Sequence, residues 1–169
     1  MENIVMFAPA GGALALLFAL YLSSKISKAE PGTERMQEIA GHIHEGAMAF
    51  LGRQYRAIAV FVIAVFLILG IFLPAESGPW QTAICFLVGG TCSALAGYIG
   101  MTVATKANVR TANAARHSQN AALGVAFSGG AVMGMTVSGL GLLGLGVLYL
   151  IFRDPSIVNG FALGGSSIA

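Results

Sequence analysis

The sequence is poor in charged residues. Only 9% of its 169 residues are Asp, Glu, Lys or Arg, while 56% are hydrophobic. Soluble domains usually carry about 25% charged residues, and a soluble fold of this size has too little interior to bury so much apolar surface. The composition therefore excludes a soluble domain and predicts an all-α fold, a polytopic bundle of transmembrane helices.

Ionisable residues are missing from the predicted membrane interior. Four stretches are long and apolar enough to cross a hydrocarbon core of roughly 30 Å. They lie at about 3–24, 55–73, 80–104 and 124–152, with Arg56 at the edge of the second, and the start of a fifth follows at 157–169. Ionisable residues at membrane depth are the usual parts of proton relays and of ion or substrate sites. We therefore assign no catalytic, cofactor-binding or metal-binding residue to this single transmembrane domain, 1–169.

Cysteine is also scarce. Cys85 and Cys92 are the only two, and they lie seven residues apart on one face of a predicted apolar helix. Small hydrophobic side chains in a packed helix are favoured here over a disulfide or a metal site.

Glycine, in contrast, is abundant, with 23 residues. In an apolar chain, small residues let the backbones of neighbouring helices approach closely. Three stripes with four-residue spacing therefore predict the faces on which helices pack. They are Gly11, Ala15, Ala19 and Ser23; Gly89, Ser93 and Gly97; and Gly130, Gly134 and Ser138.

The positive charges predict the orientation. No basic segment precedes the first apolar stretch, and Lys25 and Lys28 follow it. This order excludes a cleaved signal peptide and predicts an external N-terminus. Loops 25–56 and 105–120 hold eight of the nine Lys and Arg residues, and Arg153 is the ninth. By the positive-inside rule both loops are cytoplasmic, with a bacterial plasma membrane as the default location.

The first loop contains a predicted amphipathic helix. Pro31 and Gly32 mark a turn, and Thr33 is suited to cap a helix N-terminus. Apolar residues then follow a helical period, and we expect this helix to run unbroken into the second span. The apolar positions are Met36, Ile39, Ile43, Ala47, Phe50 and Leu51.

The second loop carries Lys106, Arg110 and Arg116 but no acidic residue, Pro or Gly. Its composition predicts two helix ends joined by a tight connection. The three cations suit either the positive-inside signal or an anionic substrate such as a phosphate, and the lack of an Asp or Glu to hold Mg²⁺ favours the first interpretation. Asn108 and Asn113 are interpreted as capping or inter-helix hydrogen-bond partners.

Polar residues before the second span also have two interpretations. His42 and Glu45 are spaced to share a metal ion, but His42 and His44 point to different faces of a helix, so a solvated helix face is favoured. Arg53 and Arg56 are interpreted as a topology signal and as anchors to lipid headgroups. A substrate role is their alternative.

Four stretches resemble the N-terminal part of the membrane-bound, ion-pumping inorganic pyrophosphatases. They are EGAMAFLGRQYR at 45–56, GYIGMTVATKANVRTANAAR at 97–116, FSGGAVMGMTVSGLGLLGLGVLYLIF at 127–152 and GFALGGSSIA at 160–169. They cover the chain in the order and topology of that family, and the motif GMTVATKANVRTANAA is specific.

The resemblance implies a homodimer of roughly sixteen-helix subunits with an external N-terminus. Such proteins hydrolyse Mg²⁺-bound pyrophosphate on the cytoplasmic side and export H⁺ or Na⁺, and some need K⁺. The first four helices belong to an outer ring around the inner helices that hold the substrate and ion sites. The implied partners are pyrophosphate, membrane lipid, the rest of the same polypeptide and a second copy, with no nucleic acid.

The chain is far shorter than subunits of that family. We therefore expect an N-terminal fragment that supplies outer-ring helices and hydrolyses nothing alone, with Mg²⁺ and any K⁺ bound beyond Ala169. The alternative is a small non-catalytic membrane scaffold or accessory subunit. The end of the chain inside an apolar segment favours the fragment.

Overall fold

The computed structural model describes residues 7–73 and 78–168, and all regular elements in these ranges are α-helices. The four long helices are apolar enough to cross a membrane. The predicted all-α bundle, with four complete transmembrane helices and the start of a fifth, is therefore confirmed. The helices are α2 (Phe7–Lys28), α3 (Glu34–Phe72), α4 (Pro79–Ala115), α5 (Gln119–Phe152) and α6 (Pro155–Ile168).

Three helices are longer than a bilayer requires. With 39, 37 and 34 residues, α3, α4 and α5 are roughly 50–60 Å long at about 1.5 Å per residue. A hydrocarbon core of roughly 30 Å covers little more than half of each. Where each helix enters the hydrocarbon stays a prediction, and residues 3–6 of the first predicted span and Ala169 of the fifth lie outside the described residues.

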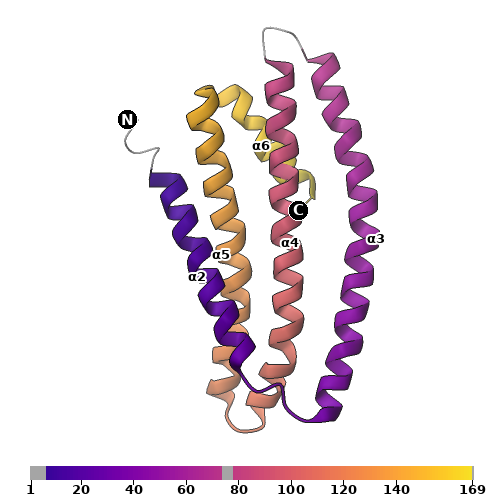
Figure 1. Cartoon of the computed structure of the whole chain (residues 1–169), viewed down its shortest axis with the longest axis vertical. Helices are drawn as coiled ribbons and strands as arrows, with labels where there is room; N and C mark the ends of the chain where they lie inside the picture. Colours follow the sequence, from indigo (N-terminus) through magenta and orange to yellow (C-terminus); the bar gives the residue numbers. More distant parts are fainter. Residues whose placement is uncertain (1–6, 74–77, 169) are drawn as a thin grey trace.

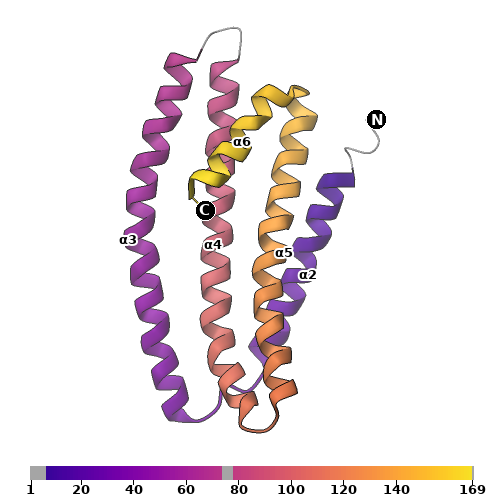
Figure 2. The same ribbon diagram turned by 180° about the vertical axis from the view of Figure 1, so that it is seen from behind.

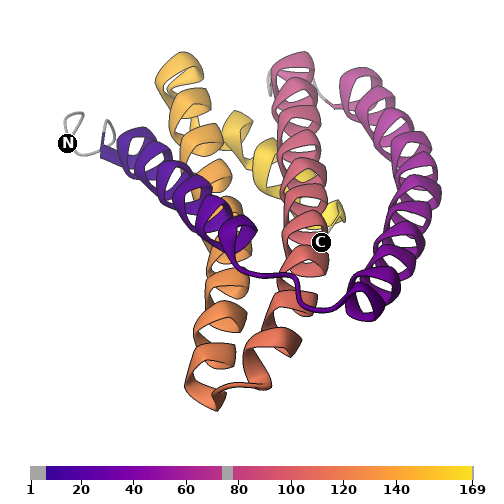
Figure 3. The ribbon, with the colours of Figure 1, turned by 60° about the horizontal axis from the view of Figure 1, so that its bottom comes forward.

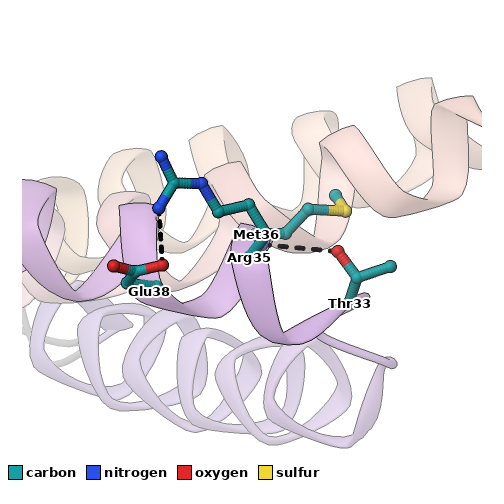
Figure 4. A network of polar contacts seen from close by, with 4 residues as sticks. All are labelled: Thr33, Arg35, Met36 and Glu38. Carbon is teal, nitrogen blue, oxygen red and sulfur yellow. Dashed lines mark hydrogen bonds and ion pairs between the residues drawn. The ribbon is translucent and has the colours of Figure 1, made fainter.

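The unbroken helix that the sequence predicts from Thr33 into the second span is confirmed. The Thr33 side-chain oxygen accepts a hydrogen bond from the Met36 backbone N–H at 3.4 Å, and this bond satisfies one of the donors that a first helical turn leaves unpaired. Figure 4 shows this cap beside the ion pair between Arg35 Nη1 and Glu38 Oε2, 2.7 Å apart.

The tight connection between the third and fourth spans is also confirmed. α4 continues as a helix through the polar passage to Ala115, and only residues 116–118 separate it from α5. Ser118 caps α5 by accepting a hydrogen bond from the Ala121 backbone N–H at 3.4 Å. Lys106 and Arg110 therefore project from a helix and not from a flexible loop.

The long helices lie side by side in the order α2, α5, α4, α3 (Figure 1). Seen from behind in Figure 2, the short α6 crosses α4 obliquely and packs mainly on it. The α4–α5 connection lies at the same end of the bundle as residues 29–33, which we call the linker between α2 and α3. Figure 3 shows that this linker passes across α4 shortly before the end of that helix to reach α3.

Glycines set the closest helix crossings. A Cβ atom placed on Gly12 of α2 would lie 2.7 Å from the carbonyl oxygen of Gly139 on α5. On α6, a Cβ atom on Gly164 would overlap the carbonyl of Phe86 on α4, and one on Gly89 of α4 would overlap the carbonyl of Phe161. Both pairs of helices thus pack backbone against backbone, as small-residue faces in membranes do.

Of the three predicted stripes, the one on α5 has the wrong register, and the one on α2 is buried only at Ala19, with its other three residues partly buried. On α2, Ala19 is buried, but a Cβ atom on Gly11 would meet nothing within 4 Å, and the close approach belongs to Gly12. On α5, Gly130 and Gly134 are exposed, and a Cβ atom on either would meet nothing within 4 Å. One residue rotates a helix face by about 100°, and the sequence offers glycines in both registers. The buried residues of the α5 face include Gly129, Val132, Thr136 and Gly139.

The third stripe packs as predicted at Gly89, which is buried against α6, while Ser93 and Gly97 are partly buried. The two cysteines of α4 are free thiols, as expected of packed apolar residues. Cys85 is fully buried, and it belongs to the apolar cluster that joins α4, α5 and α6.

Candidate functional site

The cations of the polar passage differ in their surroundings. Lys106 and Arg116 are exposed, and in the described ranges their side chains make no hydrogen bond or ion pair. Arg110 is partly buried and donates to three backbone carbonyls. Of the three cations that the sequence suggested as a possible anion site, only Arg110 is therefore held by hydrogen bonds within the described residues.

Arg110 reaches from α4 to the end of α2. Its Nε donates to the Ala29 carbonyl at 3.0 Å, and its Nη2 donates to the Ser27 carbonyl at 3.3 Å. Its Nη1 donates to the Lys106 carbonyl, one turn earlier in α4, at 2.9 Å. The guanidinium thus joins carbonyl groups that two different segments present.

Asn113 lies one turn further along α4 and is 7% exposed. Its Nδ2 donates to the Glu30 carbonyl in the linker at 3.3 Å. Asn113 thus makes a long-range hydrogen bond, but its partner is linker backbone and not another helix, so the predicted inter-helix bond is not found. Asn108 is exposed, and no bond of its side chain is found in the described part of the chain.

His44 joins α3 to α4. Its Nδ1 lies 3.0 Å from Thr105 Oγ1. The hydroxyl of Thr105 also lies within 3.1 Å of the Met101 and Thr102 carbonyls. The contact is one side-chain hydrogen bond between α3 and α4, and the tautomer of His44 decides which atom donates.

The polar groups of α3 that suggested a metal site differ in their surroundings. His42 and Glu45 are exposed, whereas His44 is partly buried against α4. In residues 7–73 and 78–168, no three His, Cys, Asp or Glu side chains come together as metal ligands would. Arg53 and Arg56 are also exposed, and their role as lipid anchors stays a prediction.

An apolar groove runs between α3 and the rest of the bundle. It has a volume of about 650 Å³ and is lined by residues of α3, α4, α5 and α6. Gln54, Tyr55 and Ser93 supply its polar lining atoms together with backbone, while Phe50, Met133 and Phe161 are among its apolar walls. Such a lining suits hydrocarbon or another helix, and none of the lining residues carries a charged side chain.

The hydroxyl of Tyr55 is the main polar contact beside this groove. It donates to the Ala94 carbonyl on α4 at 2.6 Å. Neither this contact nor the one between His44 and Thr105 could be predicted from the sequence, because the partners lie 39 and 61 residues apart. Only their placement on facing helices reveals them.

Changing Tyr55 to Phe is expected to lower the unfolding free energy by about 0.5–1 kcal/mol, since it removes one inter-helix hydrogen bond. The midpoint of unfolding in a denaturing detergent measures the change. Tyr21→Phe is the matched control, because Tyr21 is 63% exposed and the described residues give its hydroxyl no partner. Equal shifts for the two variants would contradict the expectation.

Comparison with known proteins identifies the family. A family profile described as inorganic H⁺ pyrophosphatase matches residues 13–169. Over 100% of its length the chain is 58% identical to a putative K⁺-stimulated pyrophosphate-energized sodium pump from Clostridium tetani, of which it covers 24%. It is 48% identical over 95% of its length to K⁺-insensitive pyrophosphate-energized proton pump 2 from Moorella thermoacetica, of which it covers 24%.

A third relative is the K⁺-stimulated pyrophosphate-energized sodium pump from Thermotoga maritima. It is 45% identical over 82% of the chain, and the match covers 19% of that relative. The chain thus spans about a quarter of the length of the curated relatives it matches. Together with four helices apolar enough to span a bilayer, these matches make it a multi-pass integral membrane protein. It belongs to the family of the inorganic H⁺ pyrophosphatases.

Proposed function

We propose that the complete protein is a pump that couples hydrolysis of Mg²⁺-bound pyrophosphate to transport of H⁺ or Na⁺ across a membrane. The observation that carries this proposal is the 58% identity, over the whole chain, to a relative named a pyrophosphate-energized sodium pump. Relatives named proton pumps match at 48% and 44%. The alternative, a non-catalytic scaffold or accessory subunit, is not favoured by these matches.

Within the pump, these helices act as part of the outer wall. Support comes from the predicted spans, whose described residues carry no Lys, His, Asp or Glu and only Arg56 at one edge. Exposed apolar side chains line α2 and α3, among them Leu14, Leu17, Val60 and Ile71. Such faces are suited to lipid or to other apolar helices. The groove beside α3 and the exposed Gly130 and Gly134 on α5 are where we expect the rest of the polypeptide to pack.

The residues that the structure describes do not suit a Mg²⁺ site. Mg²⁺ prefers oxygen ligands, usually carboxylates, in octahedral geometry. Glu38 is paired with Arg35, and no group of three potential ligands is found in the described ranges. We therefore place Mg²⁺, pyrophosphate and any K⁺ on parts of the protein outside this chain. K⁺ stimulation appears in the names of some relatives and K⁺ insensitivity in others.

The proposed orientation puts the N-terminus outside and residues 25–56 and 105–120 in the cytoplasm. Residues 105–120 lie at one end of the bundle, and residues 25–56 start at that end and continue along the first half of α3. The two segments hold eight of the nine Lys and Arg residues, which supports this orientation by the positive-inside rule. A bacterial plasma membrane and a homodimer complete the proposal.

Membrane vesicles that contain the complete protein are expected to hydrolyse pyrophosphate only when Mg²⁺ is present and to accumulate H⁺ or Na⁺ as they do so. Phosphate release, a pH-sensitive dye and ²²Na⁺ uptake measure the three quantities, with and without K⁺. The purified 169-residue chain is expected to release no phosphate above a heat-treated control. A complete protein without hydrolysis would contradict the pump and favour the scaffold.

A further inference from the structure

The linker joins two helices that do not lie next to each other. α2 packs on α5 and α3 packs on α4, so residues 29–33 must cross α4, shortly before the end of that helix (Figure 3). We propose that Arg110 and Asn113 form a clasp that fastens this linker to α4 and thereby fixes the path from the first to the second span. The clasp consists of the bonds of these two side chains to linker and α2 backbone.

Arg110 acts on the end of α2. The last carbonyls of a helix lack intrahelical partners and carry the negative end of the helix dipole. α2 ends at Lys28, and the Arg110 guanidinium donates to the carbonyls of Ser27 and Ala29 on either side of this end. A cation from a different helix thus caps α2, with charge-assisted bonds that are stronger than neutral ones.

Asn113 acts on the middle of the linker. Its amide donates to the Glu30 carbonyl, and its side chain also packs against Gly32. Gly32 has φ of +86°, and a Cβ atom there would lie 3.0 Å from Asn113 Oδ1. This left-handed glycine turns the chain toward Thr33, where α3 is capped. The linker therefore lies in contact with α4 from the end of α2 to the start of α3.

The same geometry opposes a substrate role for Arg110. Its three side-chain nitrogens each donate to a backbone carbonyl of this chain, which uses three of the five N–H hydrogens and holds the guanidinium against the linker. Loss of the guanidinium should therefore loosen the linker and leave the apparent affinity for pyrophosphate unchanged.

The test uses hydrogen exchange, followed by mass spectrometry, on the complete protein in lipid nanodiscs. Arg110→Lys keeps the charge, and so the orientation signal, but a lysine cannot reproduce the three-way fork of donors. We expect amides in residues 25–38 to exchange about tenfold faster in this variant, as loss of charged hydrogen bonds implies. Asn113→Ala should give a smaller increase in the same peptides. Arg116→Lys is the matched control, because the Arg116 side chain is exposed. In this variant the amides of residues 25–38 should exchange at the wild-type rate.

Two results would overturn the clasp. One is wild-type exchange of residues 25–38 in both Arg110→Lys and Asn113→Ala. The other is a raised KM for pyrophosphate in Arg110→Lys with unchanged exchange, which would make Arg110 a substrate contact. If Arg110→Lys does not fold, the exchange of residues 25–38 in Asn113→Ala alone decides whether the clasp exists. Because exchange needs no turnover, the clasp is tested even if the proposed pump activity fails.

Discussion

Replacing Gly164 with alanine is expected to destabilise the packing of α6 on α4 by roughly 1–3 kcal/mol, the usual cost of overpacking. The added Cβ atom would overlap the Phe86 carbonyl and lie 2.9 Å from the Gly90 backbone nitrogen. Backbone atoms inside a helix cannot move aside as the end of a flexible side chain does, so the helices must separate. Unfolding of the complete protein in a denaturing detergent, followed by circular dichroism, measures the loss.

Gly165→Ala is the matched control for this prediction. The nearest atom to a Cβ placed there is the Gly89 carbonyl oxygen at 4.0 Å, an ordinary contact distance. Both variants add one methyl group to the same helix and gain the same intrinsic helix propensity. A difference between them therefore isolates the helix crossing, and equal stabilities would show that α6 does not sit this close to α4.

Replacing Gly12 with valine is expected to separate α2 from α5. The Cβ atom would lie 2.7 Å from the Gly139 carbonyl oxygen and 2.7 Å from the Leu143 nitrogen, and valine adds two further methyl groups. We expect a loss of several kcal/mol, at or above the upper end of overpacking effects of roughly 1–3 kcal/mol. The fraction of protein that remains monodisperse on size exclusion after heating should fall sharply.

Gly11→Val provides the comparison one position away. A Cβ atom on Gly11 meets nothing within 4 Å, so this variant should elute and survive heating like wild type. The sequence stripe that includes Gly11 predicts the opposite ranking of the two variants. The experiment thus decides between the register that the spacing suggested and the register in the structure.

The features that could be predicted from the sequence, namely the spans, the helix cap and the turn, depend on residues that are close together in the chain. A run of apolar residues defines a span, and Thr33 caps a helix through Met36, three residues away, so both can be found without knowledge of the fold. The unbroken α3 and the short turn at 116–118 followed from the same kind of evidence. The family resemblance also rested on contiguous motifs, and the matches to pyrophosphate-energized pumps confirm it.

Contacts between distant segments explain what the sequence left open. Arg110 donates to the carbonyls of Ala29 and Ser27, which lie 81 and 83 positions earlier in the chain. Every residue has a backbone carbonyl, so the sequence does not show which carbonyls accept such a bond. The stripe of Gly130 and Gly134 has the right spacing, but the packed face of α5 uses Gly129 and Gly139. Which face of a helix meets a neighbour depends on the whole bundle.

The length of α3 and α4 has a mechanical consequence. Both helices continue without a break from the predicted spans into the segments that carry His44 and Arg110, so no hinge separates the two parts. About 20 Å or more of each helix extends past a hydrocarbon core of roughly 30 Å. Transmembrane helices adopt a range of tilts, and a change of about 10° would carry the far ends sideways by roughly 3 Å. In the bilayer orientation that we propose, each helix would act as a stiff lever that converts small rotations within the bilayer into displacements in the aqueous phase.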